Sequence, residues 1–182
     1  MRCLLITALA ASLSCTGPRS SWQTSPLVGK PVNISANRLD GRAERVPGPR
    51  ARVTVVDFWA TWCDPCRDQM PLLDRLFTEY RERGVEVYAV SFDEDRNALE
   101  EFLARIPVGF PVLWDKGGSA LAEKMDITRL PTTLILDRDG VVRAVHLGFE
   151  KGEGSALERE LRRVLSEAGQ GPAAPVSASA VR

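Results

Sequence analysis

Long apolar runs alternate along the chain with segments whose apolar residues recur at helical spacing. Together these two patterns predict an α/β fold. Residues 52–60 (RVTVVDFWA) form a nearly continuous, β-branched run, which is typical of a strand buried on both faces. Residues 85–93 (VEVYAVSFD) predict a second strand. Between them, residues 64–83 place apolar side chains at helical spacing, so we expect a helix that Pro71 kinks and Gly84 ends.

The remaining periodicities predict a hairpin and further short elements. Asp139-Gly140 is a dipeptide typical of a hairpin turn. The further predicted elements are a weak hairpin within 32–46, a helix over 95–105, a strand over 112–114, a helix over 119–125, strands over 132–136 and 141–147, and a helix over 155–168. Because strand–helix units precede an antiparallel hairpin, we expect a mixed central sheet with helices on both faces.

Composition and charge narrow the function classes. The chain has 182 residues, 44% of them hydrophobic and 26% charged, so we expect one soluble domain with tails. The 24 basic residues balance 24 acidic ones, and a formal net charge of zero argues against a nucleic-acid partner. His146 is the single histidine, which argues against histidine-rich metal sites and Ser-His-Asp catalysis.

The first 15 residues, MRCLLITALAASLSC, have the layout of a secretory signal peptide, and their apolar run is too short to span a bilayer. Ser12-Leu13-Ser14-Cys15 resembles a bacterial lipoprotein signal, so we expect Cys15 to become a lipidated N-terminus. An ordinary cleaved signal and an uncleaved short anchor are the alternatives. The predicted organisation is a signal over 1–15, a flexible tether over 16–26, a folded domain over 27–168 and a disordered tail over 169–182.

Two cysteines, Cys63 and Cys66, lie within the predicted domain, and three uses compete for them. A structural zinc site needs about four ligands, which one cysteine pair and one histidine do not supply. A structural disulfide between residues three apart would close a very small loop and restrain the unfolded chain little. A redox-active dithiol–disulfide pair accounts best for the spacing, and it needs no metal or other cofactor.

The two cysteines are expected to divide the redox work by position. Cys63 follows a predicted strand and precedes a predicted helix, so backbone N–H groups and the helix dipole would lower the pKa of its thiol. Its thiolate would attack a disulfide, and Cys66, one turn further and more buried, would resolve the mixed disulfide. Pro65 suits the first turn because its missing N–H would have no intrahelical partner there.

Asp57 interrupts the apolar strand, where a carboxylate is costly without a role or a partner. Burial would raise its pKa toward neutrality, and Asp57 could then take the proton from Cys66. A position at the sheet edge and a purely structural hydrogen bond are the alternatives. Asp64, between the cysteines, is expected to be exposed, and its charge would oppose thiolate formation at Cys63.

At this point the residues resemble the active-site stretch of thioredoxins. VDFWATWCDPC carries the cysteine pair, and Asp57 matches the family's buried aspartate. Pro71 matches its helix-kinking proline, Leu130-Pro131-Thr132 its segment with a cis-proline, and Gly148 its glycine after the last strand. Agreement of several spaced motifs is more specific than a cysteine pair alone.

The opening 27-LVGKPV-32 and the long segment 93–130 resemble the membrane-tethered TlpA/ResA-like thioredoxins of bacteria. The resemblance implies a thioredoxin fold with an extra N-terminal hairpin and a central strand-helix insertion, exported to the envelope or periplasm. Two features depart from the family. No lysine stands in the second strand, where 88-YAVS-91 is apolar, and residues 35–50 are more polar than the usual opening.

The resemblance also implies a surface that binds substrate. Pro131 would be cis and would aim the Leu130 backbone at an incoming cysteine, although a plain strand-entry proline is the alternative. Trp62 would form part of the same docking surface, beside Asp64 and Pro65.

We therefore expect an exported thiol-disulfide oxidoreductase that reduces protein disulfides in the bacterial envelope. Its clients would be cysteine-containing proteins, with apocytochrome c a candidate, and a membrane thiol donor would supply electrons to a monomer. One alternative is a peroxiredoxin-type thiol peroxidase, but its Pro-x-x-x-Thr-x-x-Cys pattern is absent because Thr61 stands two residues before Cys63. A non-catalytic binding module is the other, and it would not need both thiols. Either direction of electron flow is compatible with the sequence.

Overall fold

We describe the protein from a computed structural model, which places residues 25–150, 152 and 154–170. A five-stranded sheet has the order β5-β4-β3-β6-β7. The strands of both sheets are β1 (Ile34–Asn37), β2 (Ala43–Val46), β3 (Val53–Trp59), β4 (Val85–Ser91), β5 (Val112–Trp114), β6 (Thr132–Asp137) and β7 (Val142–Leu147). The helices are α1 (Asp64–Tyr80), α2 (Arg96–Arg105), α3 (Ala122–Met125) and α4 (Gly154–Gln170), with 3-10 turns at Arg81–Arg83 and Lys116–Gly118.

The predicted mixed sheet is confirmed, and β3 lies at its centre. β3 pairs in parallel with β4 on one side and antiparallel with β6 on the other. Every residue of β3 is buried, which agrees with its continuous apolar run. β1 and β2 pair only with each other, so the weak N-terminal hairpin is a separate two-stranded sheet.

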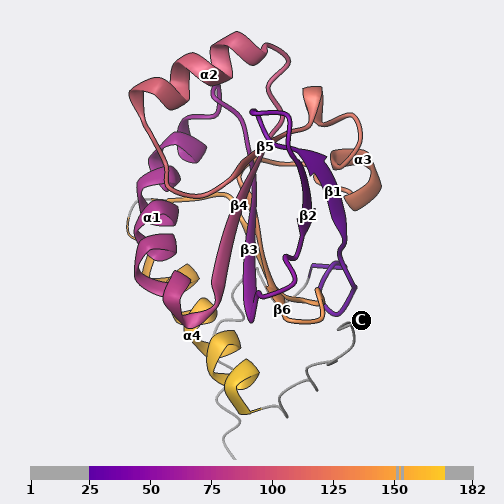
Figure 1. Ribbon diagram of the computed structural model, residues 1–182, viewed down its shortest axis with the longest axis vertical. Coiled ribbons are helices and arrows are strands. Elements are labelled where there is room, and N and C mark those ends of the chain that lie inside the picture. Colours follow the sequence, from indigo (N-terminus) through magenta and orange to yellow (C-terminus); the bar gives the residue numbers. More distant parts are fainter. Residues whose placement is uncertain (1–24, 151, 153, 171–182) are drawn as a thin grey trace, which may run out of the picture.

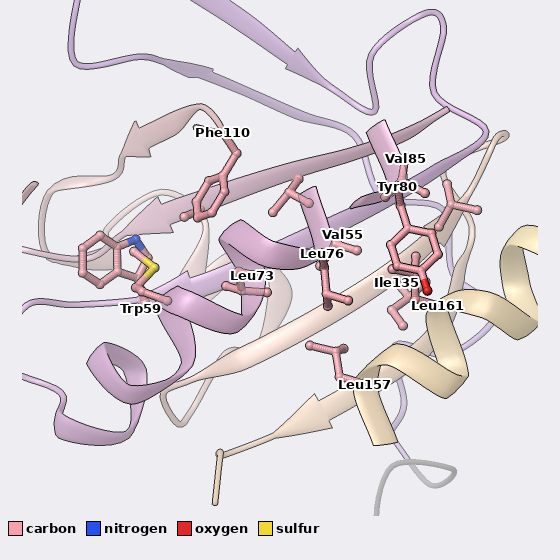
Figure 2. Close-up of a cluster of buried hydrophobic side chains, with 14 of the residues drawn as sticks. Val55, Trp59, Leu73, Leu76, Tyr80, Val85, Phe110, Ile135, Leu157 and Leu161 are labelled. Carbon is pink, nitrogen blue, oxygen red and sulfur yellow. The ribbon is translucent and has the colours of Figure 1, made fainter. Parts of the chain in front are cut away.

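The sheet separates two apolar cores, and Figure 1 shows the elements that cover its two faces. One core packs α1, α2 and α4 against alternate residues of the strands, and the other packs the β1–β2 hairpin and α3 against the opposite face. Figure 2 shows the first core, which brings Leu73 and Leu76 of α1 and Leu157 and Leu161 of α4 together with Ile135 of β6. Helices therefore cover both faces, but a hairpin takes much of the second.

Helix α1 follows the prediction for residues 64–83 closely. Cys63 is its N-cap, Pro71 lies inside it, and a 3-10 turn continues it to Arg83. Gly84 ends the segment with a φ of 87°, a left-handed conformation that glycine adopts without strain. The buried face of α1 includes Gln69, a polar side chain among apolar ones.

Two boundaries differ from the predicted ones. Of the helix expected over 119–125, only α3 forms, and a 3-10 turn in which Gly117 and Gly118 take positive φ angles of 61° and 70° precedes it. Helix α4 continues to Gln170, two residues past the predicted end of the domain. The predicted signal, Cys15, the tether up to residue 24 and the tail from 171 lie outside the described residues. Within the described part, no helix is long and apolar enough to cross a membrane.

Candidate active site

Cys63 and Cys66 form a disulfide at the start of α1, with their Cα atoms 5.3 Å apart. The N-cap position follows from the sequence, because β3 ends at Trp59 and a tight turn returns the Cys63 amide to the Ala60 carbonyl at 3.1 Å. Cys63 keeps 6% of its surface exposed, whereas Cys66 keeps none. The order of access agrees with Cys63 as attacking and Cys66 as resolving cysteine.

The surroundings of Cys63 favour negative charge on its sulfur. The backbone amide of Cys66 donates a hydrogen bond to Cys63 Sγ at 3.3 Å. The sulfur also lies at the N-terminus of a 17-residue helix, where the helix dipole attracts an anion. Both effects stabilise a thiolate once the disulfide is reduced.

The charge of Asp64 is partly balanced by a residue that sequence reasoning did not single out. Arg67, one turn further along α1, forms an ion pair with the exposed Asp64 carboxylate. Its Nη1 also donates to the Thr61 carbonyl at 3.3 Å. Because both partners are solvent-exposed, the pair is weak, but it reduces the opposition of Asp64 to a Cys63 thiolate.

Asp57 is fully buried at the centre of β3, which excludes the sheet-edge alternative. Its Oδ1 accepts hydrogen bonds from Thr133 Oγ1 at 2.7 Å and from Gln69 Nε2 at 3.2 Å. Burial raises the pKa of Asp57 to about 7, although these two hydrogen bonds oppose the rise. Among the described residues, neither Asp57 Oδ2 nor Gln69 Oε1 has a hydrogen-bond partner.

Gln69 and Thr133 are site residues that the sequence analysis missed. Gln69 lies one turn beyond Cys66 on the buried face of α1, so its polar side chain within an apolar stripe was a usable signal. Thr133 is the β6 residue directly opposite Asp57, and that register is not readable from local sequence. Together they connect helix α1, one turn beyond Cys66, to Asp57.

The Leu130–Pro131 peptide bond is cis, as the resemblance implied. Pro131 is buried and its carbonyl accepts a 2.7 Å hydrogen bond from the Gly148 amide, while Leu130 is half-buried and packs against both cores. The Val46–Pro47 bond is also cis, which the sequence analysis did not predict.

An open groove of about 710 Å³ brings most of the predicted site residues together. Its volume falls within the range of ligand pockets. Trp62 stands 67% exposed at its side. The groove is lined by the predicted residues Trp62, Cys63, Asp64, Pro65 and Leu130, and by Phe92, Glu94, Ile127 and Arg129, which were not predicted. Asp57, Cys66 and Pro131 are buried and do not line it.

The fold and the cysteine pair define a thioredoxin-like thiol-disulfide oxidoreductase. The sequence pattern of the AhpC/TSA family matches residues 28–145, and the chain belongs to that family. Among the described residues, no group of three or more histidine, cysteine or acidic side chains could hold a metal ion.

Relatives and solved structures agree with this class. The thiol-disulfide oxidoreductase ResA of Bacillus thuringiensis subsp. konkukian is 34% identical over 138 residues, covering 75% of this chain and 78% of the relative. ResA of Geobacillus kaustophilus is 32% identical over 167 residues, covering 90% and 94%. The crystal structure of a putative thiol:disulfide interchange protein DsbE from Chlorobium tepidum superposes with a TM-score of 0.70 at 28% identity, covering 76% of this chain and 96% of that one.

Proposed function

We propose that this protein reduces disulfides of cysteine-containing proteins in the bacterial envelope. The observation that supports this most directly is the Cys63–Cys66 disulfide at the start of α1, with Cys63 lining an open groove and Cys66 fully buried. An attacking sulfur at the wall of an open groove and a fully buried resolving sulfur suit exchange with a large substrate.

The reaction moves two electrons from the reduced pair to the client. Cys63 thiolate attacks one sulfur of the client disulfide, breaks that S–S bond and forms a mixed disulfide. The released client thiolate takes up a proton. Cys66 then attacks Cys63 Sγ, which forms the Cys63–Cys66 disulfide and releases the second client thiol.

Asp57 takes the Cys66 proton in this second step. Its carboxylate is available as a base near neutral pH because burial raises its pKa to about 7. Oδ1 is occupied by Thr133 and Gln69, so Oδ2 is the oxygen that accepts the proton. No charged neighbour contributes to this shift in pKa, which fits the absence of a lysine from β4.

The client segment lies in the groove, with Trp62 and Leu130 as apolar contacts and the Leu130 backbone beside the incoming cysteine. Asp64 and Pro65 complete its edge. We propose that apocytochrome c is one of the clients and that a membrane thiol donor reduces the Cys63–Cys66 pair again. We also propose that the protein is a monomer anchored to the membrane through a lipid on Cys15.

The reduction potential of the full-length protein against glutathione tests this function first. We expect a value of roughly −250 mV or lower, in the range of reductants. A value near roughly −120 mV would instead make the protein a disulfide donor. Peroxide consumption without turnover of a protein disulfide would favour the peroxidase, and no redox cycling would favour the binding module. Mass spectrometry of the exported protein tests the lipid on Cys15.

A further inference from the structure

Asp93 is a buried carboxylate next to the active-site loop that the proposed reaction does not use. It lies two residues after the end of β4 and is 2% exposed. The preceding Phe92 amide donates to the Trp59 carbonyl at 2.8 Å, so Asp93 lies beside the point where β3 leads into the loop before Cys63.

Both carboxylate oxygens of Asp93 are occupied by hydrogen-bond donors. The Thr61 amide reaches both oxygens at 3.1 Å, and Thr61 Oγ1 donates to Oδ1 at 2.6 Å. Ser91 Oγ donates to Oδ2 at 2.7 Å, and Trp114 Nε1 donates to the Asp93 carbonyl at 2.7 Å. Among the described residues no cation pairs with Asp93, so neutral groups alone hold it.

The bonds fix a peptide unit close to the attacking sulfur. Thr61 precedes Cys63 by two residues, so their Cα atoms are at most about 7.6 Å apart. Arg67 holds the carbonyl of Thr61 while Asp93 holds its amide, so the loop is clamped from both sides. Rigid placement of this loop sets the direction in which Cys63 faces the groove.

We propose that Asp93 is a positioning residue that fixes the loop before Cys63 and, as a buried negative charge, holds the cysteine pair toward the reducing end of its range. A negative charge near a thiol opposes the thiolate, and a less stable thiolate makes the reduced form less stable. Two unit charges about 10 Å apart, at an effective dielectric constant near 20, change an ionisation equilibrium about tenfold. This inference rests on the proposed function, because it assigns Asp93 a role at the Cys63–Cys66 pair.

Asp93→Asn in the full-length protein tests the charge. The acid dissociation constant of Cys63, followed by thiolate absorbance against pH, is expected to rise about tenfold. Where the thiolate predominates, the equilibrium with glutathione should shift toward the reduced protein by up to about tenfold, or about 30 mV. Asp64, Arg67 and Glu94 also lie around the loop or the groove, and they stay unchanged.

Asp115→Asn is the matched control. Asp115 is also a buried carboxylate, but it accepts from the Ala120 and Leu121 amides and not from the loop before Cys63. We expect less than a twofold change in either measurement. Equal shifts in the two variants, or no shift in Asp93→Asn, would overturn the proposal.

Thr61→Val separates the effect of the Asp93 charge from the effect of a loosened loop. It also tests the proposal if Asp93→Asn does not fold. It removes the 2.6 Å bond from Thr61 Oγ1 but leaves the carboxylate, whose charge is then less compensated. The equilibrium should shift the opposite way, toward the oxidised protein. A shift in the same direction as Asp93→Asn, or none, would count against Asp93. A wild-type protein that fails to cycle with glutathione would refute the proposed function itself.

Discussion

Two buried aspartates contact the segments on either side of the cysteine pair, and their surroundings differ in one respect. Asp57 contacts α1 one turn beyond Cys66, and within the described part of the chain only one of its oxygens accepts hydrogen bonds. Asp93 contacts the loop before Cys63, and both of its oxygens do. Both side chains are almost completely removed from solvent.

The difference shows how hydrogen bonding assigns a role to a buried carboxylate. Donors on both oxygens favour the charged form and leave no oxygen free for a proton. An oxygen without a donor lets burial dominate, so Asp57 changes protonation near neutral pH. Asp57 is thus suited to move a proton, and Asp93 is suited to hold the loop before Cys63 in place.

The largest expected effect comes from replacing each cysteine in turn, because the two variants should fail at different steps. Cys63→Ser should reduce turnover of a protein disulfide to the uncatalysed rate, because it removes the attacking sulfur. Cys66→Ser should still attack but should accumulate a mixed disulfide with the client. Mass spectrometry under non-reducing conditions distinguishes the two. If the Cys63→Ser variant formed a mixed disulfide through Cys66 instead, Cys66 would be the attacking cysteine. The roles proposed for the two aspartates would then be reversed.

Asp57→Asn should slow resolution of the mixed disulfide by about 10²-fold near neutral pH, since general base catalysis contributes at least that much. The base is the carboxylate, so the wild-type rate should rise with pH through about 7, the pKa of Asp57. Stopped-flow release of the client thiol measures the rate. Asp93→Asn should keep this pH profile, and a retained profile in Asp57→Asn would exclude proton transfer to Asp57.

The same titration predicts a change in stability. The pKa of Asp57 is raised on folding, so its contribution is fully present below about pH 3.8 and is lost as pH rises through about 7. The loss is up to about 4 kcal/mol at 1.36 kcal/mol per pKa unit. In denaturant unfolding of the oxidised proteins, the free energy of unfolding of Asp57→Asn should therefore increase relative to that of wild type from pH 4 to pH 8. Parallel curves would show that Asp57 stays charged in the folded protein.

Features that depend on local periodicity could be predicted from the sequence. The continuous apolar run predicts strand β3, and the apolar residues at helical spacing predict helix α1. Asp57 is recognisable as a lone carboxylate among apolar residues. The cysteines follow from the strand-to-helix junction. These signals lie within a few residues of each other in the chain.

The partners of the aspartates could not be predicted, because they depend on long-range register. Thr133 reaches Asp57 only because β6 pairs antiparallel with β3, and Asp93 reaches Thr61 from 32 residues away. Nothing in the local sequence distinguishes Thr133 from a surface threonine. The donors that set the role of each carboxylate are therefore a property of the fold.

The smallest expected effect tests the hydrogen bonds on Asp57 directly. Thr133→Val and Gln69→Leu should each raise the pKa of Asp57, because each removes a donor that lowers it. Thr133→Val should have the larger effect, since its bond is 2.7 Å against 3.2 Å. A hydrogen bond to a charged group is worth about 1.5–3 kcal/mol, so the shift should be at most about two pH units. The midpoint of the resolution rate against pH measures the shift.

Thr54→Val is the matched control for this pair of variants. Thr54 is also a fully buried threonine and lies in the same strand as Asp57, but among the described residues its hydroxyl has no partner. The substitution should leave the midpoint unchanged. If Thr54→Val moved the midpoint as far as Thr133→Val does, altered packing of β3 would explain the shift. The contrast between Asp57 and Asp93 would then not depend on which oxygens carry donors.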